Sequence, residues 1–189
     1  MLITFAAAAL VLSVLLRGDP RRLGQVDFKR LPWILASFIV RDASEELFKS
    51  SAPPLAGSLV LAFVCYGLLF YGLWPNLRLP GMRAVALGSL SNLVVILANQ
   101  GRMPVSVANL GPVDRARELA RLSVSINHQV LVPGTRLPFL ADLYKWTFLQ
   151  PKPLMFSVGD VLISLGVSWL MLWVSLRGSP AKTHRDTMG

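Results

Sequence analysis

Five long apolar segments dominate the sequence and constrain its fold more than any other feature. They cover residues 2–16, 31–48, 55–74, 84–98 and 155–176. About 20 apolar residues cross a bilayer as a helix, so several of these runs approach the length of a membrane span. Only 15% of the 189 residues are charged, against about 25% in soluble domains, and mean hydropathy is +0.54. The pattern predicts an all-α, polytopic transmembrane helical bundle with about five spans.

The second segment is the weak one. It is apolar only from Leu31 to Val40, and then meets Arg41, Asp42, Glu45 and Glu46. A run of about ten apolar residues is too short to span unaided. A re-entrant or interfacial placement therefore stays open beside a full span.

The chain has a net charge of +9, and many of its basic residues flank the apolar segments. They do not form the basic stripe that is typical of nucleic-acid-binding proteins. The short segments on one side carry Arg17, Arg21, Arg22, Lys29, Arg30, Arg78, Arg83, Arg177, Lys182 and Arg185. Cations in short loops mark the cytoplasmic side. We therefore expect an inner (plasma) membrane protein with its N-terminus outside and its C-terminus in the cytoplasm. The first run has its basic residues after it, the reverse of a secretory signal, so we expect a retained span.

A single transmembrane domain is predicted for residues 1–177, followed by a polar cytoplasmic tail at 178–189. Its long outer segment, residues 100–153, contains one predicted amphipathic helix. Gly111-Pro112-Val113-Asp114 is typical of a helix start, and the pattern continues to about residue 124. Its basic face would either rest on anionic headgroups or be solvated above the bundle.

Asp160 is an ionisable residue at the start of the last apolar run. Such a residue is costly to bury in a membrane and is a functional-site hypothesis by default. Ser157-Val158-Gly159-Asp160 also has the spacing of a capping box, and the helix dipole favours an anion there. A structural cap and a catalytic carboxylate are both open for Asp160.

Asp142 lies 18 residues before Asp160, among apolar neighbours. One interpretation is an i,i+3 ion pair with Lys145. The other is that the two acids meet, in which case one must hold a proton, because like charges at that range cannot both ionise. Such a pair provides the acid and the base that peptide hydrolysis by water requires.

Asn92, Asn99 and Arg102 are the candidate substrate-binding residues. Gly88, Asn92 and Asn99 are spaced to share one face of the fourth helix. Asn92 is equally explained by hydrogen bonding between helices. Arg102 is expected to pair with Asp160 or to hold a substrate's headgroup or carboxylate.

Metal and cofactor chemistry find little support in the sequence. His128 and His184 are the only histidines, and no cluster has the spacing of metal ligands. The single cysteine, Cys65, cannot form an intramolecular disulfide. We expect no metal and no cofactor.

Two resemblances are carried by these residues. Asn99-x-Gly101-x-Met103-Pro104 together with Phe156-Ser157-x-Gly159-Asp160 resembles a family of small bacterial multi-pass proteins of unknown function. More distantly, Asp142 with Phe156 to Asp160 and Gly166 is similar to the catalytic end of signal peptidase II, which cleaves prolipoproteins with two aspartates. That resemblance implies that Asp142 and Asp160 are a catalytic dyad. The sequence departs from that family where Ser157 and Gly159 replace Asn and Ala.

Three functions follow as hypotheses. The first is an aspartic-dyad intramembrane peptidase resembling signal peptidase II. The second is a non-catalytic accessory or scaffold subunit of a membrane complex. The third is a small transporter or lipid-binding protein. The expected partners are membrane lipid and either a membrane-embedded peptide substrate or a larger membrane complex, and no nucleic acid.

Overall fold

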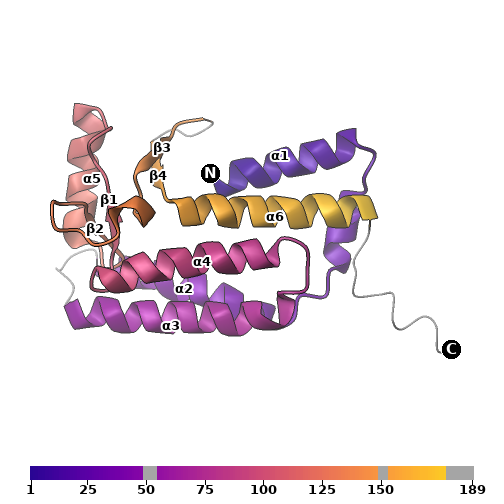
Figure 1. Ribbon diagram of the computed structural model, residues 1–189, viewed down its shortest axis with the longest axis horizontal. Helices are drawn as coiled ribbons and strands as arrows, with labels where there is room; N and C mark the ends of the chain where they lie inside the picture. Colours follow the sequence, from indigo (N-terminus) through magenta and orange to yellow (C-terminus); the bar gives the residue numbers. More distant parts are fainter. Residues whose placement is uncertain (49–54, 149–152, 178–189) are drawn as a thin grey trace.

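The computed structural model describes residues 1–48, 55–148 and 153–177, and it is mostly helical. Five long helices lie along one another and alternate in direction (Figure 1). They are α1 (Leu2–Leu15), α2 (Leu31–Leu47), α3 (Leu55–Leu73), α4 (Met82–Ala98) and α6 (Val158–Arg177). Each of the five predicted apolar segments thus overlaps one of these helices. By length and composition, α3 and α6 suffice to cross a membrane, whereas α1 and α4 are shorter apolar helices.

The helices pack in two groups. In one group α6 packs against both α1 and α4, and in the other α2 packs against α3. The α4–α6 contact depends on glycine, because a side chain on Gly88 would run into the carbonyl oxygen of Gly159. At the end of the bundle where the chain turns from α1 into α2, a buried cluster is formed by Leu73, Met82, Val85, Leu170 and Val174.

Short 3-10 turns link the helices at that end: η1 (Pro20–Gln25) follows α1, and η2 (Trp74–Asn76) follows α3. The buried Asn76 amide joins the two connections. Its Nδ2 donates to the carbonyls of Lys29 (2.7 Å) and Gly72 (2.8 Å), and its Oδ1 accepts from the Lys29 N–H (3.0 Å). A single side chain therefore fixes where α2 begins relative to the end of α3.

The opposite end of the bundle carries the segment between α4 and α6. The predicted amphipathic helix is confirmed as α5 (Pro112–Val124), which lies across this end (Figure 1). The segment also contains the 3-10 turn η3 (Pro138–Leu140) and four short strands that we did not predict. Strand β1 (Met103–Val105) pairs in parallel with β2 (His128–Val130), and β3 (Tyr144–Trp146) pairs antiparallel with β4 (Leu154–Phe156).

The start of the last helix needs a correction. The apolar run predicted a helix from about residue 155, but Met155 and Phe156 lie in β4 and α6 begins at Val158. The strand continues to Phe156 because its backbone pairs with Tyr144, and the cap at Ser157 then starts the helix. The predicted tail at 178–189 lies outside the described residues.

Candidate functional site

A cavity of about 560 Å³ lies between the two helix groups, and we call it the central cavity. Its volume falls within the range of small-molecule sites in proteins. Most of its lining is apolar and comes from α2, α3, α4 and α6. Its main polar lining residues are Arg41, Ser89, Asn92, His128, Asp142, Asp160 and Ser164.

Asp160 is held in the first turn of α6 by donors from two directions. The Asn92 Nδ2 donates to its Oδ1 (2.9 Å), and the Ser157 N–H donates to its Oδ2 (3.0 Å). The Asp160 N–H in turn donates to Ser157 Oγ (3.1 Å). These reciprocal bonds form the predicted capping box. Ser157 Oγ also donates to Asn92 Oδ1 (2.9 Å), which joins α4 to the cap.

Asp142 is held through its main chain. Its N–H donates to the Pro104 carbonyl (3.0 Å), and its own carbonyl accepts from the Ser106 N–H (2.9 Å). The residue is only 8% exposed, and its Oδ1 is buried without a hydrogen-bond partner among the described residues. Burial, and next the negative charge of Asp160, raise the pKa of Asp142 to about 8.

The predicted ion pair between Asp142 and Lys145 is wrong. Within the described part of the chain Lys145 forms no such pair, and its Nζ donates instead to the carbonyl of Asn109 (3.1 Å). The reason is that residues 144–146 adopt a strand, in which side chains three residues apart point to opposite faces. The i,i+3 pairing that we assumed requires a helix.

The structure brings Asp142 and Asp160 to the same end of the central cavity. Tyr144, two residues after Asp142, pairs with Phe156, two residues before the start of α6 at Val158. Asp160 then follows within the first turn of α6. The pairing of β3 with β4 therefore brings together the two chain segments that carry the acids.

The other two predicted binding residues lie elsewhere. Asn99 Nδ2 donates to the carbonyls of Val95 and Arg136 (both 2.8 Å), and its Oδ1 accepts from the Arg136 N–H (2.9 Å). Arg102 Nε donates to Ser58 Oγ at 2.9 Å. Neither residue lines the central cavity, whereas Asn92 does.

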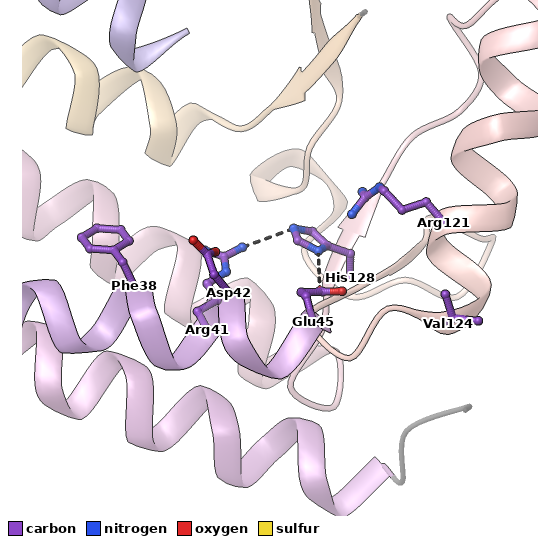
Figure 2. A pocket seen from close by; sticks show the side chains of 7 residues that line it. All are labelled: Phe38, Arg41, Asp42, Glu45, Arg121, Val124 and His128. Carbon is purple, nitrogen blue, oxygen red and sulfur yellow. Dashed lines mark hydrogen bonds and ion pairs between the residues drawn. The ribbon is translucent and has the colours of Figure 1, made fainter. Parts of the chain in front are cut away.

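Arg41 and its neighbours are site residues that we did not predict. Arg41 Nη2 lies 3.2 Å from His128 Nε2, and His128 Nδ1 faces Glu45 Oε1 at 3.4 Å (Figure 2). The available signal was the spacing of Arg41 and Glu45, four residues apart at the end of an apolar run. We had interpreted these charges only as a weakness of the second segment.

No three His, Cys, Asp or Glu side chains gather as a metal site among residues 1–48, 55–148 and 153–177.

The fold and site define a class of mostly helical protein with membrane-length helices and an apolar cavity that carries two acids in its lining. The chain belongs to a family of unknown function, DUF5317, whose pattern matches residues 25–172. That match includes Asp142 and Asp160. It confirms the expected membership of a family without an assigned activity.

A relative in the same size range is an uncharacterized protein of Thermotoga maritima. It is 27% identical over 167 residues, which are 88% of this chain and 88% of the relative. No solved structure matches the chain. The likeness to signal peptidase II stays a prediction.

Proposed function

We propose that the protein is a multi-pass inner-membrane protein in which all five long helices cross the bilayer with the N-terminus outside. Large apolar side chains on the outward faces support this placement. Ile3 of α1, Val60 and Phe63 of α3, and Leu87 of α4 are each more than 60% exposed. In water such a surface would favour aggregation, whereas lipid solvates it. The strand-bearing end then faces the outside.

We further propose that Asp142 and Asp160 form the acid–base pair of an aspartic peptidase that acts at this outer face. The observation that carries this proposal is that two carboxyl groups line one end of a single cavity and have contrasting surroundings. Asp142 is desolvated and has an oxygen without a partner. Asp160 receives two N–H donors, which suit it to hold the negative charge.

In the proposed reaction Asp160 acts as the general base and Asp142 as the general acid. The Asp160 carboxylate takes a proton from water, and the water oxygen bonds to the carbonyl carbon of a peptide. Protonated Asp142 gives its proton to the carbonyl oxygen. When the C–N bond breaks, Asp160 returns its proton to the leaving amine, and Asp142 recovers one from the diol. Water and one peptide become a carboxylic acid and an amine.

The apolar walls of the central cavity support a membrane-embedded peptide as the substrate. Asn92 binds Asp160 and lines the cavity, so we assign it a positioning role. Asn99 and Arg102 are proposed to act on the substrate only through the outer segment that they hold in place.

The test is a comparison of protein N-termini in membranes of the source organism. Cells carrying Asp142→Asn or Asp160→Asn in place of the natural protein should accumulate a precursor that the natural protein cleaves. Asp114→Asn is the matched control, because Asp114 pairs with Arg117 on the surface of α5. Unchanged N-termini with both folded dyad variants would rule out peptidase activity.

A non-catalytic membrane subunit is the second candidate, and the capping box favours it. The Ser157–Asp160 pair explains one acid by helix stability alone. This role predicts a larger complex that co-purifies equally with the natural protein and with Asp142→Asn. A monodisperse single chain in mild detergent would argue against it.

A further inference from the structure

A second, open pocket lies beside the central cavity, between α2 and α5. We call it the α2–α5 groove, and its volume is about 370 Å³ (Figure 2). It is lined by Phe38, Arg41, Asp42, Glu45, Arg121, Val124 and His128. The guanidinium groups of Arg41 and Arg121 approach His128 from the two helices on either side (Figure 2).

His128 is the neutral centre of this groove. Arg41 can only donate, so His128 Nε2 must accept, which leaves the ring proton on Nδ1 facing Glu45. Burial lowers the pKa of His128, which keeps the imidazole uncharged at neutral pH. The histidine therefore orients Arg41 without adding charge.

Glu45, one of the two carboxylates that line the groove, has other partners. Glu45 Oε1 accepts from Ser125 Oγ (2.6 Å) and from the Asn127 N–H (3.1 Å). Asp42 lies on an exposed face of α2. Glu118, outside the groove lining, accepts from Nε and Nη2 of Arg121, whereas Nη1 of Arg121 forms no hydrogen bond with the residues that the structure describes. Arg41 itself forms no ion pair with any residue that the structure describes. A half-buried cation without a carboxylate partner, near the end of a membrane helix, points to an anionic ligand.

The groove and the central cavity are continuous. Phe38, Arg41 and His128 line both, so a polar recess opens directly onto an apolar one. In the five-span arrangement proposed above, this junction lies at the level of the outer headgroups. An amphiphile with an anionic head and an apolar chain matches both parts, because guanidinium N–H groups form charge-assisted hydrogen bonds with phosphate oxygens.

We infer that the α2–α5 groove binds the phosphate of an outer-leaflet phospholipid through Arg41 and Arg121, while an acyl chain of that lipid enters the central cavity. This site rests on the proposed membrane placement and not on the proposed peptidase chemistry. It holds whether or not Asp142 and Asp160 cleave a peptide.

The test is lipid binding by the purified, delipidated full chain in a neutral detergent, followed by native mass spectrometry. Three probes separate the sources of binding: dioleoylphosphatidylglycerol, dioleoylglycerol without phosphate, and inorganic phosphate alone. We expect the phospholipid to bind at least about tenfold more tightly than dioleoylglycerol, as for loss of a charged hydrogen bond. Inorganic phosphate alone should bind far more weakly than the phospholipid.

Variants assign the binding to the groove. Arg41→Gln and Arg121→Gln should each weaken phospholipid binding, and Arg41→Lys should restore part of it. Arg117→Gln is the matched control, since Arg117 is an exposed arginine of α5 outside the groove. Arg121 is exposed, so its variant remains informative if Arg41→Gln unfolds.

Two outcomes would overturn the inference. One is equal phospholipid binding by the natural protein and both groove variants, and the other is equal binding of dioleoylglycerol and the phospholipid. Equal affinity for inorganic phosphate would overturn the lipid assignment.

Discussion

Asn92 donates a 2.9 Å hydrogen bond from Nδ2 to Oδ1 of Asp160, which lies 68 residues further along the chain. The same amide accepts from Ser157 Oγ through its carbonyl oxygen. One side chain in the middle of α4 thereby ties that helix to both members of the α6 capping box. The same contact therefore orients the candidate catalytic residue Asp160 and joins α4 to α6.

Replacing Asn92 by alanine should therefore destabilise the bundle. The change leaves the Ser157 hydroxyl and one Asp160 oxygen without their partner, which costs about 1–3 kcal/mol for buried groups. Thermal unfolding in detergent should show a lower midpoint for Asn92→Ala. Asn109→Ala is the control, because that side chain is exposed, and equal midpoints for the two variants would contradict the proposed contact.

The α4–α6 contact predicts a contrast between two glycines. Gly88→Ala places a methyl group against the Gly159 carbonyl and Ile163, so we expect a loss of about 1–3 kcal/mol from overpacking. Gly67→Ala, in α3, meets no atom within 4 Å and should be neutral or slightly stabilising. Unfolding midpoints measured side by side would show the difference. A tolerated Gly88→Ala would mean that the helices lie further apart.

The buried acid predicts a pH dependence of stability. Because the pKa of Asp142 is raised from 3.8 to about 8, the folded protein favours the protonated form. The stability from this group is full below about pH 4 and is lost as the pH rises towards 8. Asp142→Asn, which resembles the neutral acid, should flatten this slope and be the more stable protein at pH 8. Midpoints measured from pH 5 to 9 give the comparison, and parallel slopes would contradict the raised pKa.

The pH dependence of peptidase activity should also be set by the ionisation of Asp142. Asp142 must carry its proton to donate it, so turnover should fall as the pH passes about 8. The rate of precursor cleavage in membranes buffered from pH 6 to 9 measures this. A rate that is still rising between pH 8 and 9 would assign the acid role elsewhere.

The membrane arrangement can be tested by labelling with an impermeant maleimide. Cys65 is the single native cysteine, so a Cys65→Ser background accepts one new cysteine at a time. Ser123→Cys in α5 should react in intact cells, whereas Gln25→Cys in η1 should react only after permeabilisation. Both positions are exposed, so accessibility to solvent does not separate them. The reverse pattern would invert the proposed topology.

Much of the helical framework was predictable because apolar runs and caps are local signals. The five helices, the start of α5 near Pro112 and the Ser157–Asp160 cap all follow from neighbouring residues. The pairing of β3 with β4 was not predictable, since three-residue strands carry too little pattern. This omission also produced the mistaken ion pair of Asp142 with Lys145.

Some residues of the candidate site were likewise predictable from the sequence, and others were not. Asp142, Asp160 and Asn92 were identified as rare polar residues in apolar surroundings, and the structure places them around one cavity. Arg41 was missed because its significance depends on His128, 87 residues away. Asn99 had the right residue type for a binding role, but its amide is occupied by the main chain of Arg136, a contact that no local pattern reveals.

The attachment of Asp142 has a consequence for how this site can change over time. Its backbone, and not its carboxyl group, makes the bonds to Pro104 and Ser106 that join it to β1. A different side chain at this position would leave that attachment in place. Descendants of one ancestral chain could therefore exchange the acid for another group and acquire a new activity, or none, on an unchanged scaffold.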